Sequence, residues 1–114
     1  MAVIYRCFEK VLSATDITYT LEIPRTAAYL PENNDASMHV WDQRDKAWEL
    51  RMTIREDQRK ALKRKEWLRL ATENDAEVGE TVRFYFIRTP EGDSYYVKFE
   101  GPHRRRTLLL LPRN

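Results

Sequence analysis

Apolar and polar side chains alternate strictly along residues 47–54, AWELRMTI. Trp48, Leu50, Met52 and Ile54 fall on one side, and charged or hydroxyl-bearing side chains fall on the other. A period of two is the spacing of a β-strand, in which successive side chains point to opposite faces. The pattern therefore predicts a half-buried strand, which must pair with other strands to complete a sheet.

The same alternation, with many β-branched or aromatic residues, recurs in five further segments. We predict strands at residues 4–10, 18–23, 37–42, 81–88 and 94–100. The polar turn 43–46 makes a hairpin of the strands on either side of it. Pro90 and Gly92 favour a second hairpin, because proline fixes φ and glycine permits unusual backbone angles.

Residues 51–75 are the most strongly charged stretch of the chain, and one long helix is the simplest interpretation of it. At about 100° per residue, Trp67, Leu68, Leu70 and Ala71 fall within an arc of roughly 160°, a plausible buried stripe. Leu62 would lie nearly opposite that stripe and break the apolar face. Because a strand already leads into the stretch, it divides into shorter elements. We predict a charged loop at 55–58, a short strand at 59–62 and a helix at 65–74.

Pro24 begins a second helical candidate at residues 25–30, which ends before Pro31. With it, the chain is expected to form about seven strands and two short helices. The predicted fold class is mainly β and mostly antiparallel. Curled sheets of this kind tend to close into open barrels, which removes unpaired edges.

The formal net charge of +2 conceals a strong polarity along the chain. Residues 51–69 contain eight lysines and arginines against three acids, and residues 101–114 contain four arginines and no acid. The rest of the chain is therefore acidic. A concentrated basic surface is the footprint expected of an acidic partner. The alternative is a solvated charged face without a partner.

Catalysis has little support in the sequence. His39 and His103 have no cysteine or histidine partners at metal-ligand spacing, and no nucleophile, zinc, phosphate-loop or dinucleotide motif is present. We predict no enzymatic activity, no metal and no cofactor. The single cysteine, Cys7, alternates with apolar neighbours and is expected to be a buried thiol in a reducing compartment. No apolar run is long enough to cross a membrane.

Short motifs follow one another in a fixed order along the chain. They are Phe8-Glu9-Lys10, Leu12 to Asp16, Leu21 to Arg25, Leu30-Pro31, Val40 to Asp42, Trp48 to Arg51, Trp67, Asn74, Val78 to Glu80 and Val82 to Phe84. Their order and spacing resemble the plant B3 DNA-binding domain over about residues 6–101. Within that superfamily, Leu-Glu-Ile-Pro and the short segment between Asp16 and Ile23 most resemble the reproductive-meristem (REM) branch.

The resemblance implies a seven-stranded pseudobarrel that grips the major groove of DNA between two arms. In this chain the first arm is Lys10 to Thr20, with Arg25 close by, and the second arm is Arg51 to Lys60. The first set of candidate DNA-binding residues is Lys10, Ser13, Thr15, Thr18, Tyr19 and Arg25. The second set is Arg51, Thr53, Arg55, Gln58, Arg59 and Lys60. Lysine and arginine neutralise phosphates, and arginine, glutamine and hydroxyl side chains can bond to base edges.

Several residues depart from the family pattern. Glu56 and Asp57 bring negative charge to the tip of the second arm, Glu66 replaces a glycine, and Gly79-Glu80 replaces Gly-Asp. Glu56, Asp57 and the modest net charge suggest a second hypothesis. In it, the fold serves as a protein-interaction or dimerisation module with weak or no sequence-specific DNA binding.

We expect residues 1–101 to form the domain and residues 102–114 a basic tail. The primary prediction is a double-stranded DNA-binding domain of a transcription regulator or chromatin-associated protein, located in the nucleus. A protein partner or a homodimer is the alternative, whereas a membrane or a small-molecule substrate is not expected. The basic residues His103 to Arg106 could add a phosphate contact or a nuclear import signal. Residues 107–111 could add a strand or pair with another molecule.

Overall fold

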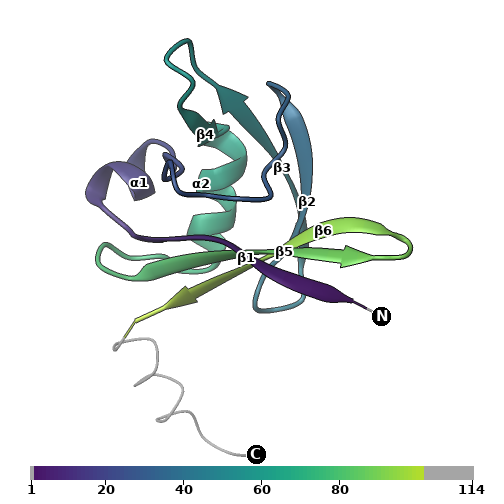
Figure 1. Cartoon of the computed structure of the whole chain (residues 1–114). Helices are drawn as coiled ribbons and strands as arrows, with labels where there is room; N and C mark the ends of the chain where they lie inside the picture. The colour runs from purple at the N-terminus through teal and green to yellow at the C-terminus, as the bar shows by residue number, and fades with distance from the viewer. Residues whose placement is uncertain (1, 102–114) are drawn as a thin grey trace, which may run out of the picture.

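The computed structural model describes residues 2–101, which form a curled sheet with two helices (Figure 1). The strands are β1 (Val3–Val11), β2 (Ala36–Trp41), β3 (Ala47–Ile54), β4 (Lys60–Leu62), β5 (Thr81–Thr89) and β6 (Gly92–Glu100). The helices are α1 (Ala14–Thr18) and α2 (Arg64–Glu73). The predicted basic tail lies outside the described residues, as does His103. No helix of the described part is long and apolar enough to span a membrane.

All six strands belong to one sheet in the order β1-β5-β6-β2-β3-β4. The two predicted hairpins, β2–β3 and β5–β6, are present and antiparallel. They are joined by a short parallel pairing of β2 with β6, in which Val40 lies opposite Tyr95. The chain is thus mainly β and forms a half-open barrel, as predicted.

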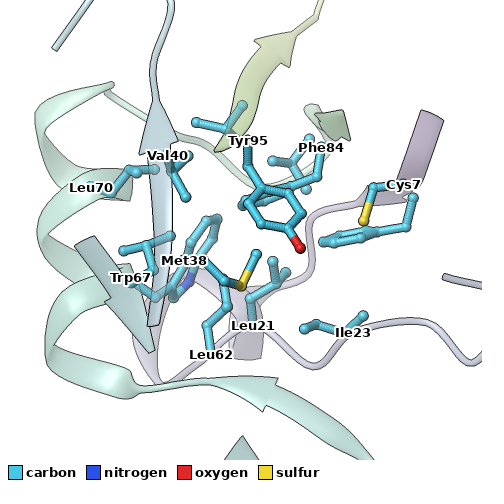
Figure 2. Packing of buried hydrophobic residues seen from close by; sticks show 14 of the residues in the cluster. Cys7, Leu21, Ile23, Met38, Val40, Leu62, Trp67, Leu70, Phe84 and Tyr95 are labelled. Carbon is cyan, nitrogen blue, oxygen red and sulfur yellow. The ribbon is translucent and has the colours of Figure 1, made fainter. Parts of the chain in front are cut away.

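The core lies between the concave face of the sheet and α2. Along β3, Leu50 and Met52 are fully buried while Glu49 and Arg51 are exposed, so the alternation of 47–54 is the burial pattern of the strand. Figure 2 shows Trp67 and Leu70 of α2 in one cluster with side chains from the strands. The Trp67 Nε1–H donates to the carbonyl oxygen of Asp16 at 2.6 Å, which ties α2 to α1.

The charged stretch 51–75 divides as predicted. Leu62 lies in β4 and is 2% exposed, whereas the helix begins at Arg64 and buries Trp67, Leu70 and Ala71. One continuous helix would have exposed Leu62 to solvent, and the stabilisation from burying its apolar side chain would have been lost.

The predicted count of seven strands is wrong, because residues 18–23 do not form a strand. Ser13 and Asp16 make a reciprocal capping box, with the Asp16 carboxylate accepting from the Ser13 N–H at 2.9 Å, and this starts α1 over Ala14–Thr18. Of the predicted strand only Glu22 is paired in the sheet, as an isolated bridge opposite Ala61.

The predicted helix at 25–30 is also absent, so the first of the two helices lies at 14–18 instead. The segment makes turns, with the Ala27 N–H donating to the Pro24 carbonyl at 3.1 Å. Tyr29 adopts a left-handed backbone with φ 63°, stacks on Tyr5 and accepts a hydrogen bond from the Tyr95 hydroxyl at 2.6 Å. A segment this short gains little from helix formation, and these tertiary contacts prevail over its local propensity.

Cys7 is buried, as predicted, and its thiol donates to the carbonyl oxygen of Ala28 at 2.8 Å. Burial raises the pKa of the thiol to about 12. The side chain therefore stays protonated and packs as a small apolar group.

Asp42, just after β2, is fully buried and organises the turn between β2 and β3. Its carboxylate accepts four hydrogen bonds of 2.9 to 3.1 Å, from the backbone N–H groups of Arg44 and Lys46 and from the side chains of Trp48 and Asn74. Burial by itself would raise the pKa of this carboxyl group. The hydrogen bonds outweigh burial and lower the pKa from 3.8 to about 2.

This shift predicts how stability depends on pH. Because the pKa of Asp42 is lower in the folded protein, its carboxylate stabilises the fold fully above about pH 4, and the contribution, about 2 kcal/mol, is lost as the pH falls towards 2. Asp42→Asn should therefore lower the free energy of unfolding at neutral pH and flatten its dependence between these pH values, measured by urea unfolding. Asp45→Asn, in the exposed part of the same turn, is the matched control. A dependence as steep in Asp42→Asn as in the wild type would contradict the assignment.

Candidate nucleic-acid interface

The second predicted arm, Arg51 to Lys60, is the end of β3, a tight turn and the start of β4. The Arg55 N–H donates to the Arg59 carbonyl at 2.8 Å, and the Gln58 N–H donates to the Arg55 carbonyl at 2.9 Å. Gln58 completes the turn in the left-handed region, with φ 70°. The side chains of Arg55, Gln58 and Arg59 are exposed, and the turn projects at the top of Figure 1.

The first predicted arm, Lys10 to Thr20, is the end of β1 followed by α1. Lys10 Nζ donates to the Asp16 carboxylate and to the carbonyl oxygen of Glu22, both at 2.9 Å. Ser13 caps α1, and the Thr18 hydroxyl donates to the Ala14 carbonyl at 2.8 Å. These interactions fix the local backbone, so Lys10 and Ser13 have structural roles in the unbound protein.

The fold brings the two arms together. A recess of about 370 Å³ between them is lined by Lys10, Ser13, Thr15 and Tyr19 from the first arm and by Arg55 from the second. Arg55 is far in sequence from the residues of the first arm, and the fold makes them neighbours by packing α1 against α2.

Two further recesses flank the second arm. One is lined by Tyr19, Arg51, Thr53 and Arg55, and the other by Arg25, Gln58, Arg59 and Lys60. Of the twelve candidate residues, only Thr18 lies outside the three recesses. Arg25 is thus placed beside the second arm rather than the first. We call the surface formed by these recesses the arm face.

Carboxylates of the protein contact the three arginines of the second arm. Arg51 Nε and the Arg51 backbone N–H each donate to the Glu66 carboxylate at 2.7 Å, and Arg51 Nη2 forms an ion pair with it at 2.7 Å. Arg59 donates to Glu22 at 2.7 Å, and Arg55 lies 3.6 Å from Glu22. Glu66 therefore orients the first arginine of the second arm.

The two acids at the tip of the arm differ in their contacts. The Asp57 carboxylate accepts from the Arg59 N–H at 3.1 Å and lies 3.5 Å from the Arg59 side chain, so it stabilises the turn. Glu56 is exposed at the tip. The two acids thus reduce the positive potential of the arm, and Asp57 itself lines the recess that contains Arg59 and Lys60.

Three basic residues of the arm face were not among the predicted site residues. Lys63, Arg64 and Lys65 line the same recess as Arg51, and the Arg64 guanidinium lies 5.0 Å from the centre of the Tyr19 ring. Their charge is evident in the sequence, but their position beside Tyr19 depends on where α2 begins.

Among residues 2–101, no group of three or more histidine, cysteine or acidic side chains could hold a metal ion. Another recess, of about 390 Å³, is lined by aromatic residues such as Tyr29 and Phe86 and by the acids Glu32 and Asp93 beside Arg88. The arm face is therefore the part of the described surface in which basic, hydroxyl and amide side chains converge.

The protein is therefore a small half-open barrel with a basic recessed face, formed by a cationic hairpin arm beside the capped helix α1. The family model of the B3 DNA binding domain matches residues 8–102, most of the chain. The chain therefore belongs to the B3 DNA-binding domain family.

Solved structures share this fold. A FUS3–DNA complex from Arabidopsis aligns with a TM-score of 0.67 and 15% identity, covering 84% of this chain and 97% of the other. A hypothetical protein of Arabidopsis thaliana aligns with a TM-score of 0.61 and 22% identity, covering 89% and 92% respectively. No curated protein sequence matches the chain significantly.

Proposed function

We propose that the arm face binds double-stranded DNA and that the protein acts in the nucleus, in transcriptional regulation or chromatin association. The observation that carries this proposal is the shared recess in which Lys10, Thr15 and Tyr19 of the first arm meet Arg55 of the second. Membership of the B3 family and a fold shared with a protein solved in complex with DNA support it. The REM branch remains our proposal for the closer relationship, on the sequence motifs alone.

In the proposed mechanism the two arms embrace the duplex. Arg55, Arg59 and Lys60 contact phosphates, which gives affinity without sequence information. Gln58, exposed at the arm tip, and the hydroxyl groups of Thr15 and Tyr19 reach base edges. We extend the phosphate-binding surface to Lys63, Arg64 and Lys65, because they line the recess of Arg51.

The competing proposal is a protein-interaction or dimerisation module of B3 type. The observation that favours it is that carboxylates of the protein itself neutralise Arg51, Arg55 and Arg59. An arm face neutralised in this way would have a weaker attraction for DNA than the count of basic residues implies.

Selection of binding sites from random duplexes, followed by titration of the selected duplex, separates the two proposals. If the protein binds duplex DNA, the selection should enrich a sequence motif. The protein should then bind the selected duplex more tightly than single-stranded DNA of the same sequence. The absence of any duplex binding at low salt, together with a concentration-dependent dimer, would favour the interaction module.

A further inference from the structure

Glu22 places a carboxylate between the two arginines at the base of the arm turn. One oxygen accepts from Arg59 Nη1 at 2.7 Å, and the other lies 3.6 Å from Arg55 Nη1. The backbone carbonyl of Glu22 accepts from Lys10 Nζ at 2.9 Å. Three cationic side chains of the arm face therefore converge on one residue.

The backbone around Glu22 fixes this position. The Ile23 N–H donates to the Lys60 carbonyl at 2.9 Å, and the Leu62 N–H donates to the Leu21 carbonyl at 3.1 Å. Leu21 and Ile23 are buried, so an extended backbone directs the intervening side chain outward, onto the arm face. Glu22 also lines the recess between the two arms.

Glu22 differs from the other carboxylate that holds an arginine of the second arm. Glu66 is 23% exposed and receives two hydrogen bonds and a further ion-pair contact from Arg51, which makes it a fixed support. Glu22 is 37% exposed, and its partners Arg55 and Arg59 are 42% and 47% exposed. Exposed ion pairs contribute little net stability, so the Glu22 pair can open at low cost.

We propose that Glu22 occupies the position of a DNA phosphate in the unbound protein and sets the affinity of the arm face. This inference rests on the proposed function. Carboxylate and phosphate oxygens accept the same hydrogen bonds from guanidinium groups. Binding of the duplex therefore requires a phosphate to displace the Glu22 carboxylate from Arg55 and Arg59, and the carboxylate then repels the phosphate nearby.

Glu22→Gln tests this role, because it retains the length and a carbonyl oxygen but removes the charge. Affinity for duplex DNA should rise roughly tenfold near 0.1 M salt, and the slope of log K against log salt should steepen by about 1. Glu91→Gln in the exposed β5–β6 turn changes the net charge equally and should alter affinity less than twofold. Equal affinities of the two variants, or weaker binding by Glu22→Gln, would overturn the proposal while leaving DNA binding intact.

A second probe decides the question independently of DNA. Tripolyphosphate, titrated while the side-chain NMR signals of Arg55 and Arg59 are followed, should bind Glu22→Gln more tightly than it binds the wild type or Glu91→Gln. If no variant bound duplex DNA, the proposed function would fail, but this titration would still test the displacement of Glu22. Equal tripolyphosphate affinities in all three proteins would overturn the role of Glu22.

Discussion

Replacing both Arg55 and Arg59 with glutamate is expected to lower the affinity for duplex DNA by about a hundredfold or more near 0.1 M salt. Each phosphate contact, through the counterions it releases, raises the binding constant roughly tenfold at 0.1 M salt relative to 1 M salt. The double variant loses two such contacts and adds two repulsive charges. Both side chains are exposed and face Glu22, so their replacement should leave the core intact.

The matched control for this variant is Arg6→Glu with Arg88→Glu. These arginines are exposed on β1 and β5, outside the arm face, and their reversal changes the net charge by the same amount. Fluorescence anisotropy with a labelled duplex measures both variants, and circular dichroism confirms that each is folded. An equal loss of duplex affinity in the two variants would mean that binding depends only on the net charge of the protein. The second arm would then have no specific role.

The largest effect on stability is expected at Trp67. The side chain is fully buried between α2 and the sheet, contacts Phe99 and donates to the Asp16 carbonyl. Trp67→Ala should cost about 3 to 5 kcal/mol in the free energy of unfolding. Because small domains have a total stability of about 5 to 15 kcal/mol, the variant should be partly unfolded at 37 °C.

Urea unfolding compares Trp67→Ala with two controls. Trp67→Phe keeps most of the packing and loses the bond to Asp16, so it should have an intermediate stability. Trp41→Ala removes a tryptophan that is 44% exposed and should have a small effect. A Trp67→Ala protein as stable as Trp41→Ala would show that α2 is not needed to close the core.

Local patterns predicted the strands and α2 because burial there follows a simple period. The alternation of Trp48 to Ile54 and the position of Leu62 depend only on which side of the backbone each residue occupies. By contrast, residues 18–23 alternate well but are held by the Ser13–Asp16 capping box and by a single bridge at Glu22. Propensity could not distinguish that bridge from a strand.

The residues of the candidate site could be proposed from the sequence, whereas their ion pairs could not be predicted from it. Family motifs and basic charge identified Arg51, Arg55 and Arg59, because these depend on residue type and order. Their partners Glu66 and Glu22 lie in other parts of the chain. The packing of α2 against β3 brings Glu66 within 4 Å of Arg51, and the packing of residues 21–23 against β4 brings Glu22 within 4 Å of Arg55 and Arg59. Tyr29 illustrates the same limit, since its left-handed backbone is set by contacts with Tyr5 and Tyr95.

The dependence of duplex affinity on salt tests the central claim most directly. If the arm face engages about five phosphates, log K should fall against log salt with a slope of about −4 to −5. The double variant of Arg55 and Arg59 should reduce the magnitude of that slope by about 2. A measurable duplex complex whose affinity is independent of salt, or no complex at low salt, would contradict the claim that this arm face binds DNA through its phosphates.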